Sequence, residues 1–229
     1  MAIRVGVFQK SYYGSADAAD HVRDQLNNNT TYDFEASVIT AGININTEAK
    51  LNNYDVIILG DDGSVESVPE WNVAANALNT WVSNGGGLVT TSWCSSYVSG
   101  YPYVIDPLFS AIIPIEFDGY LDTQTTIEID NHTHPITKGI SNFSIATVQQ
   151  DCGTIKTGAT TLASSSTAGR TTSTVTTWHF GKGTVVCLTP LYLGSRTAYG
   201  TDLNLLEAGD ADKLLGQTTY YAATAMLRD

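Results

Sequence analysis

A serine and a cysteine that stand close together could supply a nucleophile. Ser92 and Cys94 come at the end of a predicted strand in the first half of the chain. Nucleophilic catalysis there needs a general base within about 3 Å of the hydroxyl or thiol. Three histidines occur late enough in the chain to provide it: His132, His134 and His179. The alternative interpretation is that Cys94 is a small, buried apolar side chain.

Two adjacent carboxylates, Asp61 and Asp62, follow an apolar strand pattern directly. Ligands of open α/β sheets usually bind at the carboxyl ends of the strands, so this pair could bind a cation or orient a sugar hydroxyl. The alternative, which the Asp-Gly pair at Asp62 and Gly63 favours, is a tight turn in which one carboxylate caps the next helix.

The sequence predicts no metal centre and no cofactor. His132 and His134 could share a metal with Asp130, because alternate residues of a strand point to one face. No neighbouring motif supplies further ligands, so a polar loop before a proline turn is the favoured interpretation. Residues 202–212 lack the spacing of a calcium loop. No CxxC pair, as in zinc or redox sites, occurs among the three cysteines, which are Cys94, Cys152 and Cys187.

Aromatic and arginine side chains stand on predicted loops and strand ends. Trp178 precedes a Gly-Lys-Gly turn, Tyr192 and Arg196 follow the last predicted strand, and Tyr12 follows the first. Such side chains are typical of a carbohydrate site or a protein interface. A loop that only covers the sheet edge is the alternative. These residues favour recognition over catalysis, with a protein partner, self-association or a small carbohydrate-like ligand.

Strands and helices that alternate in the first half must position these residues. Unbroken Val, Ile and Leu runs predict strands that are buried on both faces, as in a parallel sheet covered by helices. The predicted strands are Ile3–Phe8, Phe34–Ile39, Asp55–Leu59 and Leu88–Trp93. The predicted helices are Ala16–Asn27 and Pro69–Ser83.

The second half reads as an antiparallel extension of the same sheet. Its predicted strands are rich in Thr and Ser, and Gly181-Lys182-Gly183 predicts a turn between the last two. They are Thr125–Ile129, Thr160–Ser166, Thr174–Phe180 and Val185–Leu188. A closing helix is expected over Ala211–Leu227. No linker or repeat divides the chain, so we expect one α/β domain over residues 1–229.

The charge and composition exclude several classes of partner. The 229 residues include 11 Lys and Arg against 23 Asp and Glu, a formal charge of −12, and the basic residues occur singly. Nucleic acid and anionic membranes are therefore not expected as partners. The sequence predicts no signal peptide and no membrane-spanning segment. A cytoplasmic location is the default expectation, with a virion or cell surface as the alternative.

Five phrases, in this order along the chain, resemble the class I glutamine amidotransferase-like superfamily, and within it the ThuA-like branch of non-amidotransferases. They are YDVIILGDDGS (54–64), ALNTWVSNGGGLVTTSW (77–93), HPITKGI (134–140), FGKGTVVCL (180–188) and GDADKLLGQTTYYAATA (209–225). The resemblance implies a flavodoxin-like, doubly wound sheet. It puts Ser92, not a cysteine, at the nucleophile position, and no glutamate follows His134 and Pro135. The amidotransferase triad is therefore incomplete.

Three hypotheses for the function follow. The first is a catalytically degenerate amidotransferase-like domain that acts as a binding or assembly module. The second is a ThuA-like hydrolase or sugar-modifying enzyme, with Asp61, Asp62, Ser92 and His134 around a pocket at the carboxyl ends of the strands. The third is a self-assembling structural protein of a particle or filament, whose Thr-rich strands would pair between subunits.

Overall fold

The structure is a computed structural model that describes most of the chain. The described residues are 1–8, 17–60, 70–94, 106–121, 124–145, 150–167, 170–194 and 203–224. Four of the predicted ligand residues lie outside these ranges, namely Tyr12, Asp61, Asp62 and Arg196.

Among the described residues, nine strands form one mixed sheet in the order β2-β1-β3-β4-β11-β10-β9-β6-β7. The first five pair in parallel, and the last four join through antiparallel pairs. The predicted flavodoxin-like α/β fold with an antiparallel extension is confirmed. The strands are β1 (Ile3–Phe8), β2 (Phe34–Ile39), β3 (Val56–Leu59), β4 (Gly87–Thr90), β6 (Thr125–Ile129), β7 (Phe143–Ile145), β9 (Thr160–Thr167), β10 (Arg170–Phe180) and β11 (Gly183–Leu188).

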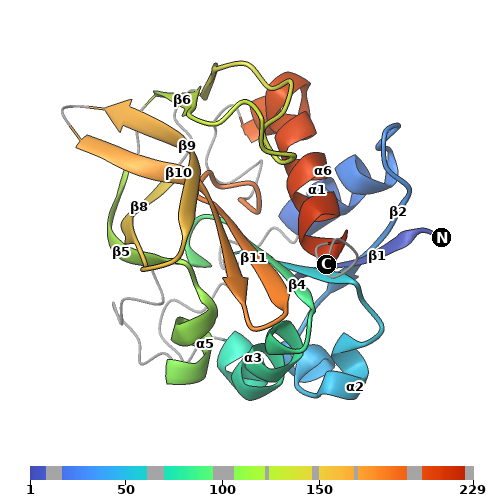
Figure 1. The fold of residues 1–229 in the computed structure, drawn as a ribbon. Coiled ribbons are helices and arrows are strands. Elements are labelled where there is room, and N and C mark those ends of the chain that lie inside the picture. The colour runs from blue at the N-terminus through green and yellow to red at the C-terminus, as the bar shows by residue number, and fades with distance from the viewer. Residues whose placement is uncertain are drawn as a thin grey trace.

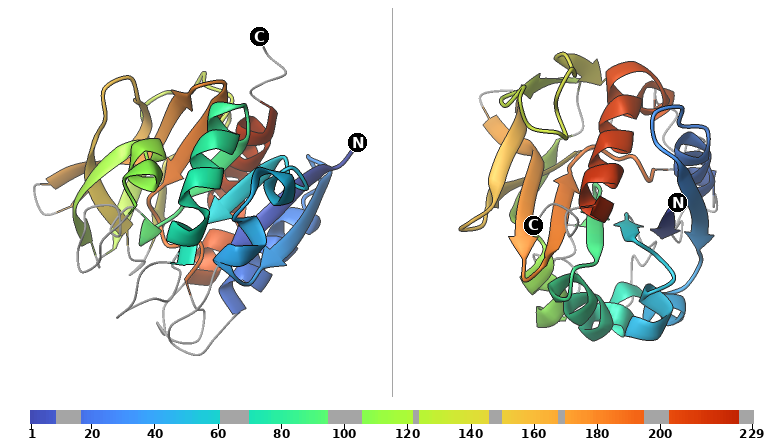
Figure 2. Two further views of the ribbon diagram at one scale, coloured as in Figure 1. Left: turned by 90° about the horizontal axis from the view of Figure 1, so that it is seen from below. Right: turned by 45° about the vertical axis from the view of Figure 1, so that its right-hand side comes forward.

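Helices cover both faces of the parallel half of the sheet (Figures 1 and 2). One face packs against α1 (Asp17–Asn27) and α6 (Gly209–Thr224), with the 3₁₀ turn η3 (Leu203–Glu207) leading into α6. The other face packs against α3 (Ala75–Ser83) and smaller elements. These are η1 (Gly42–Ile45), α2 (Glu48–Leu51), η2 (Glu70–Ala74) and α5 (Pro107–Ile112). The predicted helix Pro69–Ser83 thus begins as a 3₁₀ turn.

A second, two-stranded sheet was not predicted from the sequence. It consists of β5 (Ile115–Leu121) and β8 (Gln150–Ile155), which pair antiparallel with an irregularity between Phe117 and Gly119. The backbone N–H of Asp151 in β8 donates to the carbonyl of Thr189, just beyond β11, at 3.2 Å. This contact ties the small sheet to the carboxyl end of the large one.

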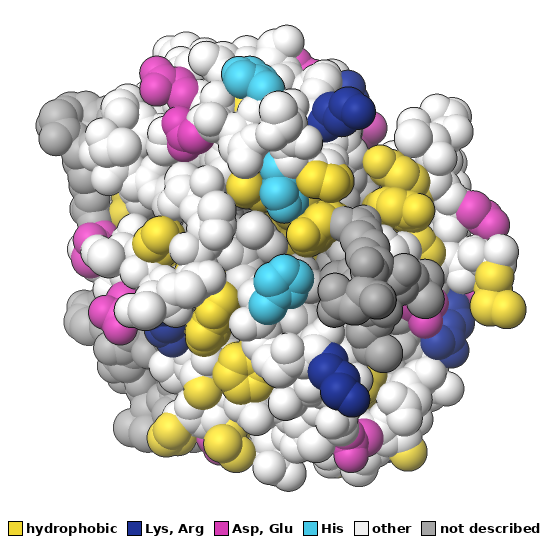
Figure 3. All heavy atoms as spheres, viewed as in Figure 1, with side chains coloured by type: hydrophobic (Ala, Val, Ile, Leu, Met, Phe, Trp, Pro, Cys, Tyr) yellow, Lys and Arg dark blue, Asp and Glu magenta, His cyan; other side chains and the backbone are white. Residues whose placement is uncertain are grey.

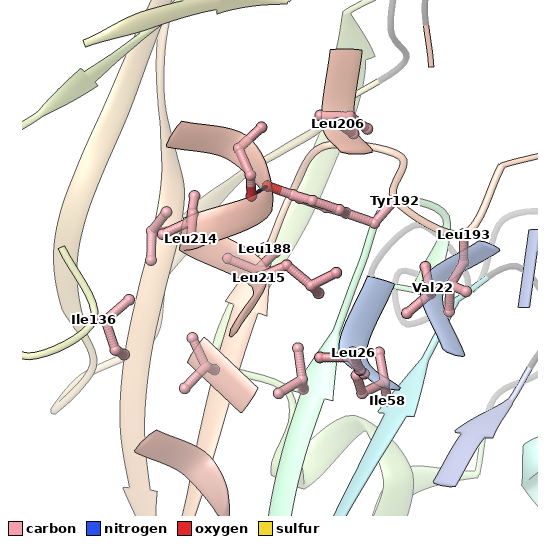
Figure 4. Close-up of a cluster of buried hydrophobic side chains, with 14 of the residues drawn as sticks. Val22, Leu26, Ile58, Ile136, Leu188, Tyr192, Leu193, Leu206, Leu214 and Leu215 are labelled. Carbon is pink, nitrogen blue, oxygen red and sulfur yellow. Dashed lines mark hydrogen bonds between the residues drawn. The ribbon is translucent and has the colours of Figure 1, made fainter. Parts of the chain in front are cut away.

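The hydrophobic core lies on both sides of the large sheet, because residues of each parallel strand point alternately to the two helical layers. Figure 4 shows the side covered by α1 and α6, where Leu26 of α1, Ile58 of β3 and Leu215 of α6 meet. Every residue of β3 and β4 is buried. The unbroken apolar runs that predicted these strands therefore reflect burial on both faces.

Helix α6 packs so closely on β4 that Gly87 has no room for a side chain. A Cβ at this position would lie 2.5 Å from the carbonyl oxygen of Ala222. We expect Gly87→Ala to lower the free energy of unfolding by about 1–3 kcal/mol, because the helix must move away from the sheet. Urea denaturation measures this loss.

Gly216→Ala, within the same helix, is the matched control. Its added Cβ would lie 2.7 Å from Nδ2 of Asn29 and 3.8 Å from the Tyr32 ring, so it meets side chains and no backbone of another element. Alanine also has the higher helix propensity, by about 1 kcal/mol. We expect this variant to lose less stability than Gly87→Ala, because only the Asn29 amide, which accepts from the N–H groups of Thr31 and Tyr32, must adjust. Equal destabilisation by both substitutions would contradict the close packing at Gly87.

Candidate functional site

The strand β4 ends earlier than the sequence suggested, and the chain then turns sharply. Regular pairing stops at Thr90, not at Trp93, and the N–H of Cys94 donates to the carbonyl of Thr91 at 3.2 Å. Trp93 has φ +70°, and no other described non-glycine residue has a positive φ. The left-handed conformation costs an L-residue about 1–2 kcal/mol. A sharp, strained turn after a strand is the backbone of a nucleophile elbow.

The residue in the strained conformation is a tryptophan, which carries no nucleophile. The resemblance of the GGGLVTTSW phrase predicted Ser92 at the nucleophile position, whereas the left-handed φ occurs one residue later, at Trp93. Cys94 is fully buried, and Ser92 is 1% exposed. The elbow therefore presents an aromatic side chain, with both candidate nucleophiles beneath the surface.

The hydroxyl of Ser92 bonds to a buried carboxylate. Its Oγ donates to Oδ1 of Asp151 at 3.2 Å, and Asp151 is itself 1% exposed. The backbone N–H of Ser92 points to the carbonyl of Pro190 at 3.4 Å. The ends of β4, β8 and β11 thus meet around one serine–carboxylate pair, at the edge where open α/β sheets bind ligands.

No histidine accepts the proton of Ser92, although all four histidines of the chain lie in described ranges. His21 of α1 pairs with Glu207, with Nδ1 and Oε1 2.9 Å apart. His132 is exposed in a turn. His179 of β10 faces Thr184 at the beginning of β11, with Nδ1 3.3 Å from the hydroxyl. A serine and histidine couple of the hydrolase type is therefore not assembled.

His134 lies toward the opposite end of the strands from Ser92. Its ring packs on Tyr221, with centroids 4.8 Å apart. The next residue of α6, Ala222, contacts Gly87 at the beginning of β4. Gly87 begins β4, whereas Ser92 lies two residues beyond the last residue of that strand, Thr90. The predicted grouping of His134 with Ser92 is therefore wrong: the HPIT turn docks on the last turns of α6.

Two further predicted ligand residues are placed away from an open site. Trp178 of β10 pairs with Val185 near the beginning of β11, at the amino edge of the parallel strands, and packs edge-on against Phe180. Tyr192 is fully buried, and its hydroxyl donates to the carbonyl of Ala211 at 2.9 Å (Figure 4). Burial raises the pKa of Tyr192. Tyr192 is a core residue that anchors the beginning of α6, so its predicted role as a ligand residue is wrong.

An aromatic pair stands beside the serine–carboxylate pair. The rings of Trp93 and Tyr120 of β5 are 5.8 Å apart with an interplanar angle of 35°. Tyr120 is 54% exposed, and Trp93 is half-buried, packed against both sides of the core. Aromatic faces next to buried hydrogen-bonding groups are what a small polar ligand with an apolar face requires.

Asp151 and Tyr120 are not among the residues that the sequence predicted for the site. Tyr120 stands in IEFDGYL, whose alternating exposure is a strand signal that could have been found. Asp151 is preceded by Gln150 and followed by Cys152, without periodicity, and its burial depends on the contact of β8 with the large sheet. Only the tertiary structure reveals this carboxylate.

The buried cysteines near Asp151 are not activated thiols. Burial raises the pKa of Cys187 to about 12, and the charge of Asp151 adds to the shift. Burial likewise raises the pKa of Cys152 to about 11. Because the thiolate is the reactive form, both side chains are poor nucleophiles at neutral pH.

This shift predicts a pH-dependent stability. In the unfolded chain Cys187 ionises with a pKa near 9.0, so above that pH the unfolded state loses a proton that the folded state keeps. The stabilisation from the protonated thiol is present below pH 9 and is lost as the pH rises toward 12. Between pH 8 and 10 we expect the wild-type protein to lose about 1–2 kcal/mol more than Cys187→Ala. Urea denaturation at the two pH values measures it, and equal losses would contradict the assignment.

Within the described ranges, no three or more His, Cys, Asp or Glu side chains are grouped so that they could hold a metal ion. None of the helices in those ranges has the length and apolar character needed to cross a membrane. On the face shown in Figure 3, Lys and Arg side chains lie apart from one another, with acidic side chains between them.

No protein-family model matches the chain, and no curated protein matches it. Solved structures do share the fold. The cytoplasmic protein STM1381 from Salmonella typhimurium LT2 superposes with a TM-score of 0.73 at 15% identity, over 96% of this chain and 99% of that chain. A ThuA-like protein from Bacteroides uniformis gives 0.68 at 16% identity, over 97% and 91%.

The same fold occurs as part of a larger enzyme. The β-galactosidase from Bacillus circulans sp. alkalophilus superposes with a TM-score of 0.60 at 16% identity, over 97% of this chain but 30% of that chain. At these identities the comparisons establish the fold, and it is the one found in ThuA-like proteins.

Proposed function

We propose that the protein is a catalytically degenerate, amidotransferase-like binding module that holds a small carbohydrate at the carboxyl edge of its sheet. The observation that carries this proposal is the elbow after β4. There the strained residue is Trp93, paired with exposed Tyr120, and Ser92 is bonded to a buried aspartate rather than a histidine.

The proposed ligand follows from the chemistry of this edge. A pyranose ring has an apolar face that stacks on an aromatic side chain and hydroxyl groups that bond to polar ones. Trp93 and Tyr120 offer the aromatic face, and the phenol hydroxyl of half-exposed Tyr120 offers a polar group. The buried Ser92–Asp151 pair supports them from below, because Ser92 precedes Trp93 and Asp151 pairs with Tyr120 in the small sheet. The likeness to part of a β-galactosidase supports a carbohydrate. The Salmonella neighbour is described as cytoplasmic, and we propose the same compartment here.

Turnover assays separate binding from catalysis. We expect no hydrolysis of glutamine, p-nitrophenyl esters or p-nitrophenyl glycosides above the buffer rate, and no difference between the wild-type protein, Ser92→Ala and Cys94→Ala. Calorimetric titration of the same preparation with mono- and disaccharides should show saturable binding. Turnover that disappears in Ser92→Ala would overturn the proposal.

The second candidate is a ThuA-like hydrolase. The observation in its favour is the 3.2 Å contact between the Ser92 hydroxyl and the Asp151 carboxylate, which places an oxygen nucleophile beside a potential base. The low exposure of Ser92 argues against a hydrolase, because a substrate must reach the Ser92 Oγ. In the same assays a hydrolase would lose turnover both in Ser92→Ala and in Asp151→Asn.

A further inference from the structure

The outward edge of strand β2 is occupied by a side chain. In the described sheet β2 is the last strand at one end and pairs with β1, and it lies at the rim of the molecule (Figures 1 and 2). The carboxamide of Asn27, the last residue of α1, accepts from the N–H of Ala36 at 2.7 Å and donates to the carbonyl of Ala36 at 3.1 Å. A backbone N–H is a single donor, so this bond shows that Ala36 faces away from β1.

Asn27 stands where the peptide group of a further strand would be. A carboxamide carries the same donor and acceptor as a peptide group, so it makes at Ala36 the pair of bonds that an added strand would make. Alternate residues of a strand direct their backbone groups to the same side, so Ala36 is the middle member of an outward set with Phe34 and Val38. Another strand cannot pair along β2 while Asn27 is in place.

The opposite end of the sheet offers little edge as well. Its last strand, β7, has three residues, and short edge strands are poor templates for pairing. Beyond the end of β7, the N–H of Ile129 of β6 donates to the side-chain oxygen of Asn142 at 2.8 Å. The Thr-rich strands β9 and β10, which the sequence allowed to pair between subunits, have neighbours on both sides within the described sheet. Their edges are therefore occupied by the protein itself.

We propose that Asn27 keeps the protein from pairing with a second copy of itself through β2. An unoccupied sheet edge is a template for strand pairing between chains, and charged side chains are a common protection. This protein has few of them, 15% of its residues against about 25% in an average domain, and β2 carries one, Glu35. The hydrogen bonds of Asn27 supply the protection instead. The inference concerns self-association and does not depend on the proposed sugar site.

Asn27→Ala tests the proposal, with Asn53→Ala as the matched control. Asn53 is also exposed and also bonds to a backbone carbonyl, that of Lys50 at 3.1 Å, but it lies in the turn before β3. In sedimentation velocity over a wide range of concentration, we expect Asn27→Ala to associate reversibly and more strongly than the wild-type protein, and Asn53→Ala to behave as the wild type. In dilute solution the Ala36 amide of Asn27→Ala should exchange its hydrogen about 3–10-fold faster, the equivalent of one net hydrogen bond.

The double variant Asn27→Ala/Ala36→Pro separates strand pairing from misfolding. Proline has no N–H, and an edge strand tolerates it where the N–H faces away from the sheet. We expect this variant to return to the wild-type mass. The proposal is overturned if Asn27→Ala keeps the wild-type mass at every concentration, if the double variant associates as strongly as the single one, or if the exchange of the Ala36 amide is unchanged. A failure to bind sugar would leave these results unaffected.

Discussion

Trp93→Ala is expected to weaken sugar binding about tenfold or more, because a central aromatic side chain of a binding site contributes most of its contact energy. The indole is the larger half of the aromatic pair with Tyr120, and it stands on the elbow after β4. Calorimetric titration with the tightest-binding sugar of the panel measures the loss. Tyr120→Ala should cause a smaller loss in the same experiment.

Two variants control for indirect effects. Trp178→Ala removes an indole at the opposite edge of the sheet, so its sugar affinity should equal that of the wild-type protein. Trp93→Gly removes the same indole but relieves the positive φ, and it should be more stable than Trp93→Ala by about 1 kcal/mol. Both Trp93 variants should bind sugar about tenfold or more weakly than the wild-type protein. If either retains wild-type affinity, the site lies elsewhere.

Tyr192→Ala should lower the free energy of unfolding by about 3–5 kcal/mol, the cost of removing a large buried aromatic side chain. The ring is fully buried among the leucines of α6 and the strand ends, and it bonds to the backbone at the beginning of that helix (Figure 4). Chemical denaturation checks this value.

Tyr192→Phe isolates the hydroxyl. The ring stays in place, but the carbonyl of Ala211 loses its partner inside the protein, so we expect a loss of about 1–2 kcal/mol. Sugar affinity of the folded variant should be unchanged, because Tyr192 offers no surface to a ligand. A variant of wild-type stability with reduced sugar affinity would instead restore Tyr192 as a ligand residue.

The sequence predicted those strands whose burial or turn is visible in the residue pattern of the segment itself. The run VIIL predicted β3, because both faces of that strand are buried. The two predicted strands on either side of the Gly181-Lys182-Gly183 turn predicted the antiparallel hairpin of β10 and β11. Strand β8 escaped prediction because QDCGTI has neither alternation nor an apolar run. Its Gln150 and Asp151 are buried only because another sheet covers them.

The candidate site was predicted only in part, because some of its contacts join residues far apart in the sequence. Ser92 could be placed at the end of a strand from local pattern, but its bond to Asp151 joins residues 59 positions apart. His134 was predicted as a site residue because a histidine before a proline is typical of an exposed loop. In the structure its ring packs on Tyr221 of α6, toward the amino edge of the sheet. The burial of Tyr192 had a weak signal, since Leu191 and Leu193 flank it and both are buried.

Indole NMR is the most direct measurement of the central claim, because the protein has four tryptophans in distinct places, Trp71, Trp81, Trp93 and Trp178. In a titration of ¹⁵N-labelled protein with the sugar panel, we predict that the Trp93 indole resonance shifts saturably while that of Trp178 stays in place. A sugar-dependent shift at Trp178 without one at Trp93, or no shift with any sugar, would contradict a carbohydrate site at the elbow.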